Sequence, residues 1–548
     1  MENDEEYNSY ENANNRINAE KVGENEMDLF KIFKGKKNTK APIPKEKQNR
    51  LYPELDQNLS TIKEALGNAN DLLIRQLRLA GENNIGAAVL GIDGLIDANQ
   101  AEQFIVHVLA IDLSLVDDTN NRSYGVFQSI FESRISMIDA KCGQSFQDLY
   151  TNLLNGHVIV LIDGVDQFMM FDCKGWQMRS ISEPQTEQSV YGPKDCFVET
   201  IRVNTATLRR RIKDHRLRFD AHVVGKVTQT DVFVAYIDGV TDPKLVETVN
   251  KRIESIDIDG FVDSSELMQL IEDHHITIFP RLHQSERPDK VSAALMQGGI
   301  VILFDGSPFV TIGPAYFATM FQATDDYYSR PLIATLMRIL RYASFFMVIL
   351  VPGLYVAIST FHQEMIPTVL LITIINQRSA NPFPTYIETL VILVLFEVIR
   401  EASIRTPSVV GNSMTIVGSL IIGQTIVQAG LVSYMVIIIV SITSIAAFIL
   451  SSSRLNNATR ILTFIFLFLG ATFGLYGITI GFILLILHLC SLTTLDQPYL
   501  ASMAPFNLHD QEDQFLRLPL SWMKYRPRIF KTRNKIRHNL DDAMREEE

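Results

Sequence analysis

Cysteine is scarce in this sequence, and its few copies lie far apart. The 548 residues contain four cysteines without any CxxC pair: Cys142, Cys173, Cys196 and Cys490. This spacing argues against a zinc site and against a disulfide framework. The first thirty residues are acidic and rich in Asn, and they lack the apolar core of a signal peptide. We therefore expect reduced thiols in a cytoplasmic setting.

The motifs of common enzyme classes are missing as well. The sequence contains no Walker phosphate loop, no GxSxG nucleophile elbow and no recognisable catalytic histidine pairing. His362 and Glu364 lie two positions apart, and an interfacial loop explains them better than a metal pair does. We expect no enzyme activity, no catalytic residue, no bound metal and no cofactor.

Charged and apolar residues are segregated along the chain. The net charge is −12, with the charged residues concentrated before position 330 and after 523, and the apolar residues crowd between 340 and 492. This pattern predicts an α/β cytoplasmic region of two subdomains followed by an α-helical polytopic membrane domain. The expected parts are a disordered N-terminal tail (1–50), subdomain 1 (51–180), subdomain 2 with the membrane connector (181–330), a multi-pass transmembrane domain (331–505) and a basic cytoplasmic C-terminal tail (506–548).

Four apolar runs in the front half end in the same dipeptide. AAVLGIDG, VIVLIDG, VFVAYIDG and IVILFDG each end in Asp-Gly, with the aspartates at Asp93, Asp163, Asp238 and Asp305. Their spacing of about 70 residues predicts strand-then-turn units repeated in two subdomains. Asp-Gly supplies the tight turn after each strand, and this interpretation is favoured over an acidic metal cluster.

A basic helix is expected between the second and third of these strands. Its cations could contact phosphate or nucleic acid, but no aromatic residues are interleaved with them. Because three glutamates stand nearby, ion pairing between domains or subunits is favoured over nucleic acid. The cations are Arg202, Arg209, Arg210, Arg211 and Lys213, and the candidate partners are Glu183, Glu187 and Glu199.

Five short motifs occur in a characteristic order. They are SEPQTE (182–187), GPKDCF (192–197), ERPD (286–289), DGSP (305–308) and DYY (326–328). In this order they resemble the GerA family of spore germinant receptors, specifically its A subunits. Cys196 and Gly299 depart from the residues usual in that family. Together with the ion-pair argument, the motifs make five residues candidates for a subunit or domain interface: Glu187, Arg209, Glu286, Arg287 and Asp289.

The resemblance implies a location, partners and a function. Members of the family work in the spore inner membrane with a transporter-like B subunit that binds the nutrient and with a lipoprotein C subunit. A subunits are thought to assemble into a ring-shaped cation channel that opens when nutrient is sensed. On this basis we expect a multi-pass protein of the lipid bilayer that self-associates, with its N-terminal region cytoplasmic, and that does not bind nucleic acid.

The membrane block divides into several apolar segments. We expect a first crossing at 342–359, an outer loop at 360–384, a return at 383–399 and a crossing at 432–450. The run 461–492 contains Gly470, Gly474, Gly477 and Gly481, which suit one tilted helix with a glycine seam. The basic tail that follows it favours a hairpin instead, because the positive-inside rule returns such a tail to the cytoplasm.

Several charged groups lie in or beside these segments. Glu397, Glu401 and Arg405 share one helix face, and Glu388 lies roughly opposite Glu397. Charged groups are expensive in lipid, so they must face other protein or water. A salt-bridge row between helices and a carboxylate ring at a pore mouth remain equally open.

The run 411–431 is apolar yet rich in Gly, Ser, Thr and Gln. One helical stripe contains Ser413, Val417, Leu420, Gln424 and Gln428, so it is polar at its ends and apolar in its middle. In a symmetric ring, Val417 and Leu420 would form a dewetting constriction flanked by the glutamines. The alternative is that the glutamines bond to neighbouring helices; the resemblance favours the pore.

Two other functions compete with the channel. A secondary transporter would need an inverted repeat of broken helices, and no such repeat is found in the membrane block. A non-conducting scaffold or signalling subunit would need only the soluble assembly surfaces. Conductance of the assembled protein separates this second alternative from a channel.

Overall fold

The structure is a computed structural model that describes residues 50–79, 85–109, 122–132, 140–175, 184, 186–273, 276–379, 381–405 and 423–538. The chain divides into two units, residues 1–49 and residues 50–548. The predicted disordered tail at 1–50 lies outside the described residues except for its last position.

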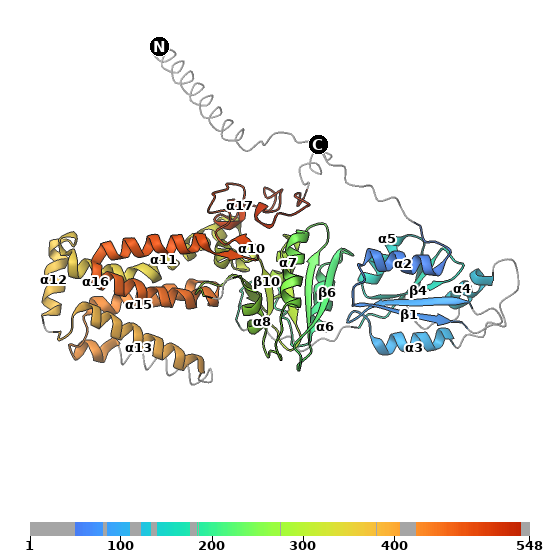
Figure 1. Cartoon of the computed structure of the whole chain (residues 1–548), viewed down its shortest axis with the longest axis horizontal. Helices are drawn as coiled ribbons and strands as arrows, with labels where there is room; N and C mark the ends of the chain where they lie inside the picture. The colour runs from blue at the N-terminus through green and yellow to red at the C-terminus, as the bar shows by residue number, and fades with distance from the viewer. Residues whose placement is uncertain are drawn as a thin grey trace, which may run out of the picture. The chain divides into compact units, whose positions relative to one another are not determined.

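Subdomain 1 is a five-stranded antiparallel sheet with helices on both faces (Figure 1). Its central strand HVIVLI is buried at every position, as expected of a wholly apolar run. The strand order is β1-β2-β4-β5-β3, and each neighbouring pair is antiparallel. The elements are α2 Leu55–Ala65, β1 Leu72–Arg78, β2 Gly86–Ile92, α3 Ala98–Leu109, α4 Arg122–Glu132, β3 Ala140–Gly143, α5 Phe146–Leu154, β4 His157–Ile162 and β5 Phe168–Asp172.

Subdomain 2 repeats the same succession of helices and strands. Its sheet has the order β6-β7-β9-β10-β8 and is also antiparallel, so the two sheets share one topology. The predicted repeat of strand-and-turn units is therefore confirmed. The elements are α6 Ile201–Arg211, β6 Leu217–Val224, β7 Thr230–Ile237, α7 Pro243–Glu254, α8 Ser264–Ile271, β8 His283–Ser285, α9 Pro288–Met296, β9 Ile300–Phe304 and β10 Val310–Gly313.

The Asp-Gly pairs close the turns after β2, β4, β7 and β9. All four glycines have positive φ, between 75° and 93°, which glycine adopts without steric cost. Two of the aspartates also cap a helix. Asp163 Oδ1 accepts from the Leu55 amide at 3.1 Å, and Asp305 Oδ1 accepts from the Ile201 amide at 2.9 Å. The turn interpretation of the sequence is thus confirmed.

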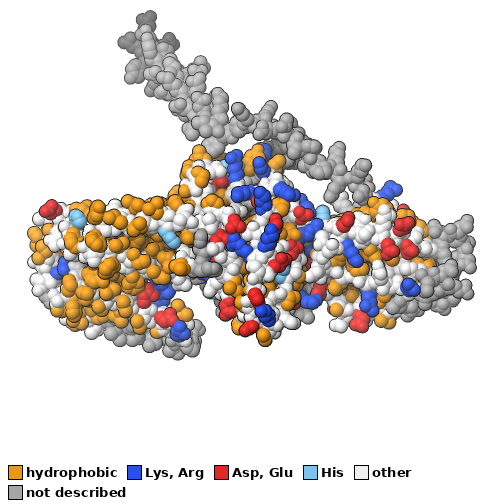
Figure 2. All heavy atoms as spheres, viewed as in Figure 1, with side chains coloured by type: hydrophobic (Ala, Val, Ile, Leu, Met, Phe, Trp, Pro, Cys, Tyr) orange, Lys and Arg blue, Asp and Glu red, His pale blue; other side chains and the backbone are white. Residues whose placement is uncertain are grey.

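The region after residue 330 is built from apolar helices. Figure 2 shows hydrophobic side chains covering its visible face, whereas charged side chains gather over the two sheets. Among the described residues, two helices, α11 and α16, are long and apolar enough to cross a membrane, and α15 is a shorter apolar helix. The elements are α11 Pro331–Phe361, η3 Gln363–Met365, α12 Thr368–Arg378, α13 Thr385–Arg405, α15 Tyr434–Ile449 and α16 Ser453–Ser491.

The segment predicted as an outer loop at 360–384 is largely helical. It contains η3 and α12, so the loop prediction was wrong for most of its length. The apolar run TVLLITIINQR explains the difference. It follows Pro367 directly, at a position where proline readily precedes a helix.

Helix α16 folds back on itself at Gly474, whose φ of 60° and ψ of −144° are not helical. A Cβ at Gly481 would lie 2.6 Å from Leu469 Cδ1, and one at Gly477 would lie 2.5 Å from the Leu469 carbonyl oxygen. In a straight helix, Leu469 and Gly481 would be about 18 Å apart along the axis. The predicted hairpin is therefore confirmed. Gly477 and Gly481 lie where its arms meet, whereas Gly470 and Gly474 lie against α11.

The C-terminal segment packs against the junction between subdomain 2 and the helices. Tyr316, which is fully buried, donates from its hydroxyl to the Ile529 carbonyl at 3.0 Å. Arg526 Nε donates to the Met296 carbonyl at 2.9 Å. The remaining elements are η2 Phe317–Phe321, α10 Asp325–Tyr328, β11 Thr493–Thr494, β12 Gln497–Pro498, α17 Gln511–Gln514 and η4 Arg528–Phe530.

Candidate functional site

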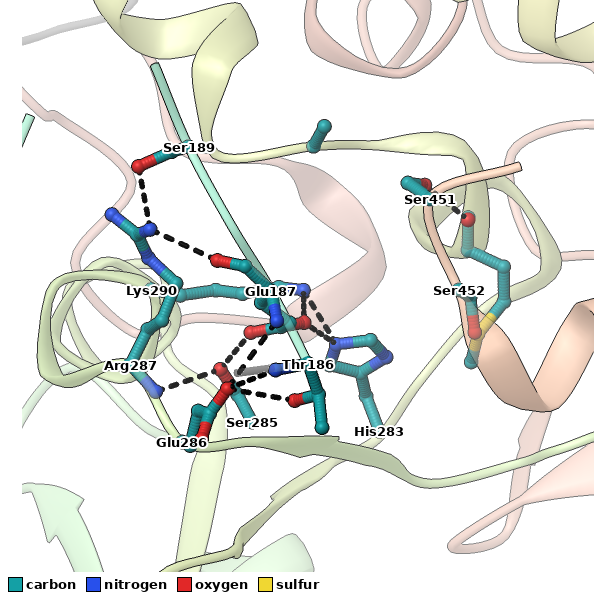
Figure 3. A network of polar contacts seen from close by, with 12 residues as sticks. Thr186, Glu187, Ser189, His283, Ser285, Glu286, Arg287, Lys290, Ser451 and Ser452 are labelled. Carbon is teal, nitrogen blue, oxygen red and sulfur yellow. Dashed lines mark hydrogen bonds and ion pairs between the residues drawn. The ribbon is translucent and has the colours of Figure 1, made fainter. Parts of the chain in front are cut away.

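The ERPD motif lies in the turn between β8 and α9, where it holds the segment around residue 187 (Figure 3). Glu286 Oε1 accepts from the Thr186 amide at 2.6 Å, the Thr186 hydroxyl at 2.8 Å and the Glu187 amide at 3.3 Å. Three donors on one buried carboxylate oxygen stabilise its charge. Glu286 therefore fixes the backbone of the SEPQTE motif onto subdomain 2.

Glu187 is held by three side chains in the same network (Figure 3). It accepts from Lys290 Nζ at 2.6 Å and from Ser285 Oγ, and its Oε1 lies 3.3 Å from His283 Nε2. Burial alone would raise the pKa of Glu187, but the Lys290 charge and His283 lower it well below its usual value. Burial and the Lys290 charge also lower the pKa of His283, so its ring stays neutral near pH 7.

Arg287 joins the network to the DYY motif. Its guanidinium donates to Asp289 at 2.8 Å, to Ser189 Oγ at 2.6 Å and to the Pro193 carbonyl at 3.0 Å. Tyr328 donates to the same Asp289 carboxylate, and its pKa is raised to about 12 by burial and by that hydrogen bond. Three motifs that lie far apart in the sequence thus meet at the start of the helical region.

A second buried network ties the DYY motif to α11. Asp326 accepts from Arg338 Nε at 2.9 Å and from Arg341 Nη1 at 2.8 Å, and all three residues are buried. Arg338 also pairs with Asp513 at 3.2 Å. We call these four residues the arginine clamp. It joins subdomain 2, α11 and the C-terminal segment.

The aromatic ring of Tyr327 packs against the arginine clamp. The guanidinium carbons of Arg338 and Arg517 lie 5.6 and 5.1 Å from the centre of the Tyr327 ring. The sequence interpretation missed the clamp. Its only signal was the pair Arg338 and Arg341, two cations three positions apart in an otherwise apolar helix, which must be paired if they are buried.

The basic helix α6 contacts carboxylates of this same chain. Arg209 forms two hydrogen bonds with Asp71 of subdomain 1, at 2.7 and 3.1 Å, and both side chains are buried. The structure thus places Arg209 between the subdomains, as the ion-pairing interpretation expects. The partners seen for three of these cations are aspartates, not the glutamates named as candidates. Arg202 pairs with Asp93 and Arg211 with Asp195, whereas Glu187 pairs with Lys290 and Glu183 lies outside the described residues.

The candidate charges on α13 are paired within one chain. Glu397 pairs with Arg400 and lies 3.8 Å from Arg460, and Glu401 pairs with Arg405 at 2.7 Å. Glu388 is 1% exposed, and it accepts from the Ser433 amide at 3.1 Å and from Asn381 Nδ2 at 3.2 Å. Since Ser433 is the N-cap residue of α15, Glu388 stabilises the start of that helix. The pairs of Glu397 with Arg400 and of Glu401 with Arg405 lie within α13, and the contact of Glu397 with Arg460 joins α13 to α16.

Two of the five pore candidates lie among the described residues. Ser413, Val417 and Leu420 lie outside the described residues. Gln424 and Gln428 lie in the helical stretch 423–428, and both are exposed.

Taken together, a duplicated α/β region is joined by buried ion pairs to apolar helices. This architecture, with two helices long and apolar enough to cross a membrane among the described residues, is typical of a membrane-associated protein. No group of three metal-ligating side chains occurs among the described residues.

The chain was compared with known protein families, proteins and structures. The family model described as Bacillus/Clostridium GerA spore germination protein matches residues 60–529. The chain is 39% identical to spore germination protein KA of Bacillus subtilis, covering 91% of this chain and 90% of the relative. It is 36% identical to spore germination protein GerLA of Bacillus cereus, covering 88% and 97%.

A solved structure is also similar to part of the chain. It is the N-terminal domain of the A subunit of the Bacillus megaterium spore germinant receptor GerK3, at 31% identity, a TM-score of 0.40, and coverage of 50% of this chain and 99% of that one. The family match extends over most of the sequence. This chain therefore belongs to the GerA family of spore germination proteins, and the resemblance recognised in its motifs is confirmed.

Proposed function

We propose that this chain is the A subunit of a nutrient germinant receptor and that copies of it form a cation channel in the spore inner membrane. Membership of the GerA family supports the receptor role. The arginine clamp is the observation that best supports the proposal. Through buried charges it couples the motif network of subdomain 2 to α11, the first long apolar helix. Separating such pairs is costly, so this junction moves as one body.

The proposed membrane topology follows from the two candidate spans. Helix α11 leaves the junction at Pro331, and the bend of α16 at Gly474 packs against Phe361 at the other end of α11. Both ends of α16 return to subdomain 2, where Arg454 contacts Gln284 and His488 contacts Thr277 at 3.1 Å. The basic C-terminal segment then lies on the side of the soluble region, which the positive-inside rule assigns to the cytoplasm.

The partners in this proposal are a transporter-like B subunit that binds the nutrient, a lipoprotein C subunit and further copies of this chain. Nutrient binding to the B subunit shifts a closed-open equilibrium, and the arginine clamp passes the shift to α11. Exposed Gln424 and Gln428 are free to face a central axis in a ring. The exposed stripe of α15, which contains Tyr434, Ile438, Ile442 and Ile445, suits lipid or a neighbouring copy.

Reconstitution tests this proposal. The full chain, purified as an oligomer and inserted into liposomes, should pass K⁺ or Na⁺ in discrete single-channel steps. Val417→Ala should widen the apolar middle of the stripe and increase the leak, whereas Glu397→Gln should reduce cation flux at unchanged protein level.

Each competing function predicts a different result. A correctly assembled oligomer without any flux would assign the chain to a scaffold or signalling role. A saturable flux without unitary steps would indicate a secondary transporter. If Val417→Ala leaves the leak unchanged, the gate is formed by other residues of the chain.

A further inference from the structure

A pocket of about 350 Å³ lies among the helices, away from the arginine clamp. It is formed by the end of α11, by η3, by the end of α12, by the start of α13 and by the arm of α16 that precedes the Gly474 bend. Its polar lining includes Ser359, Thr360, Gln363, Arg378, Thr385 and Tyr386. This volume is within the range of pockets that hold small molecules.

The position of the pocket in the helical region is set by the neighbouring contacts. Arg338, near the start of α11, is bound to Asp326 at the junction, whereas Ser359 and Thr360 are two of its last three residues. The bend of α16 at Gly474 lies beside Phe361 and His362. The pocket is therefore at the opposite end of α11 from the soluble subdomains, which is the outer face in the topology proposed above.

Arg378 is the charged residue of this pocket. Among the described residues that line it, none is acidic, and no ion pair or side-chain hydrogen bond of Arg378 occurs in the part of the chain that the structure describes. Glu388, in the first turn of α13, accepts hydrogen bonds from the Ser433 amide and from Asn381 Nδ2. A guanidinium partly removed from water without a counter-charge favours an anionic ligand.

Thr385 provides a second, independent sign of a ligand. It is 1% exposed, and its Oγ1 is buried without a hydrogen-bond partner among the described residues. A buried hydroxyl without a partner is unfavourable unless a ligand or water satisfies it. Thr385 is also the first residue of α13, and the N-terminus of a helix favours negative charge.

We propose that this pocket binds one small oxyanion, a carboxylate or a phosphate, between the Arg378 guanidinium and the Thr385 hydroxyl. Phe468 and Ala471 provide an apolar wall for the rest of the ligand. A zwitterionic amino acid fits poorly, because no carboxylate is present among the described lining residues to receive its ammonium group. The anion has two possible sources, a small molecule in solution or the headgroup of an anionic phospholipid.

Calorimetric titration of the purified full chain in neutral detergent tests the charge requirement. The probes are benzoate, its uncharged analogue benzamide, and inorganic phosphate. Benzoate should bind saturably and at least tenfold more tightly than benzamide. Arg378→Gln should weaken benzoate binding at least tenfold, and Thr385→Val, which removes only the hydroxyl, should weaken it severalfold. Arg405→Gln is the matched control and should leave binding unchanged, since Arg405 is paired with Glu401.

Nanodiscs separate the two sources of the anion. If a soluble anion occupies the pocket, benzoate should bind equally in phosphatidylcholine discs and in discs that contain phosphatidylglycerol. If a lipid occupies it, phosphatidylglycerol should suppress benzoate binding and should stay with the delipidated wild type but not with Arg378→Gln. Equal affinity of the wild type for benzoate and benzamide, together with no Arg378-dependent retention of phosphatidylglycerol, would overturn the proposal. None of these measurements depends on conductance, so they stand apart from the channel proposal.

Discussion

The two α/β subdomains are built alike down to individual hydrogen bonds. In subdomain 1, the Asn58 side chain bonds to both the amide and the carbonyl of Tyr52, at 2.9 and 2.6 Å. In subdomain 2, Asn204 makes the same two bonds to Val198, at 2.9 and 2.6 Å. With the matching strand order and the matching aspartate caps, these contacts show one structural unit used twice.

The subdomains differ at one equivalent turn. In subdomain 1, the turn between β3 and α5 contains Ser145, which caps α5 by accepting from the Gln147 amide at 3.1 Å. In subdomain 2, the turn between β8 and α9 contains Glu286 and Arg287, which bind the segment from Thr186 to Pro193. The same position serves as a plain helix cap in one copy and as the centre of a motif network in the other.

This difference indicates where the specific function resides. The shared contacts maintain the scaffold, whereas the motifs that occur only in subdomain 2 lead through Asp289 and Tyr328 to the arginine clamp. Substitutions at shared positions should therefore change stability in both copies alike. Substitutions in the second network should also disturb the helical region.

The largest effect is expected from Arg338→Met. This change leaves Asp513 without its guanidinium partner and removes one of the two arginines on Asp326, both in buried surroundings. We expect a loss of about 3–5 kcal/mol in the free energy of unfolding, typical of breaking a buried ion pair. Thermal unfolding of the full chain, monitored by circular dichroism, measures this loss of stability.

Arg330→Met is the control for that variant. Arg330 is exposed and lies eight positions earlier, just before α11. Its substitution should change the melting temperature little. Equal effects of the two substitutions would show that the clamp contributes nothing beyond an ordinary surface arginine.

A smaller effect is expected at the contact between the two copies. Arg209 and Asp71 are 0% and 6% exposed, whereas Arg202 and Asp93 are 69% and 29% exposed. Arg209→Met should cost about 3 kcal/mol, because it leaves Asp71 buried and unpaired. Arg202→Met should cost at most about 1 kcal/mol, since its partner remains partly hydrated.

Cys173 provides a local measurement of this contact. Its thiol is buried in the core of subdomain 1. In a variant whose other three cysteines are replaced by serine, the temperature at which Cys173 reacts with a thiol-specific dye reports the unfolding of that copy. Arg209→Met should lower this temperature more than Arg202→Met does. The double variant Arg209→Met/Asp71→Leu should recover most of the loss, and a failure to recover would show that the guanidinium has other roles.

The sequence predicted the features that depend on local chemistry. Asp-Gly after an apolar run specifies a strand and a turn, and the basic tail after residue 523 specified the hairpin in α16. The hairpin needed no knowledge of tertiary contacts, because the sign of the charges at one end of the segment decides which side of a membrane that end occupies.

The features missed in the sequence depend on partners far away in the chain. Arg338 and Asp513 are 175 positions apart, and Arg209 and Asp71 are 138 apart. Nothing local favours Asp71 over the nearer glutamates, because the choice depends on which surfaces of the two subdomains meet. Glu388 is similar: its role as a cap of α15 depends on a helix that begins 46 positions later.

Acidification should weaken the motif network of subdomain 2. Burial and the Lys290 charge hold the pKa of His283 below its usual value of 6.5, so its neutral form contributes stability above pH 6.5. This contribution is lost as the pH falls through 6.5, because the unfolded chain then binds the proton first. The pKa of Glu187 is also lowered, and its contribution is lost only below about pH 4.5.

Between pH 7.5 and 5.0, the histidine effect should therefore dominate within this network. The wild type should lose stability from His283 over this range. In His283→Gln, the fall in melting temperature should be smaller. His222→Gln, a substitution of a histidine outside the network that contacts Asn250, should keep the wild-type slope. Parallel slopes for all three proteins would exclude His283 as the titrating group.

The smallest effects are expected at the paired aspartate caps, and they test the equivalence of the two copies most directly. Asp163→Ala and Asp305→Ala each remove an acceptor from the first amide of a helix, α2 in one copy and α6 in the other. Each should cost about 1 kcal/mol, which corresponds to roughly 2–4 °C in a domain of this size. Asp163→Ala should lower the temperature at which Cys173 reacts. Asp305→Ala should affect Cys173 less, because α6 belongs to the other copy and reaches subdomain 1 through the contacts of Arg202, Ala206 and Arg209. If both substitutions shift Cys173 equally, the two copies unfold as one cooperative unit and the scaffold is continuous across the Asp71 contact.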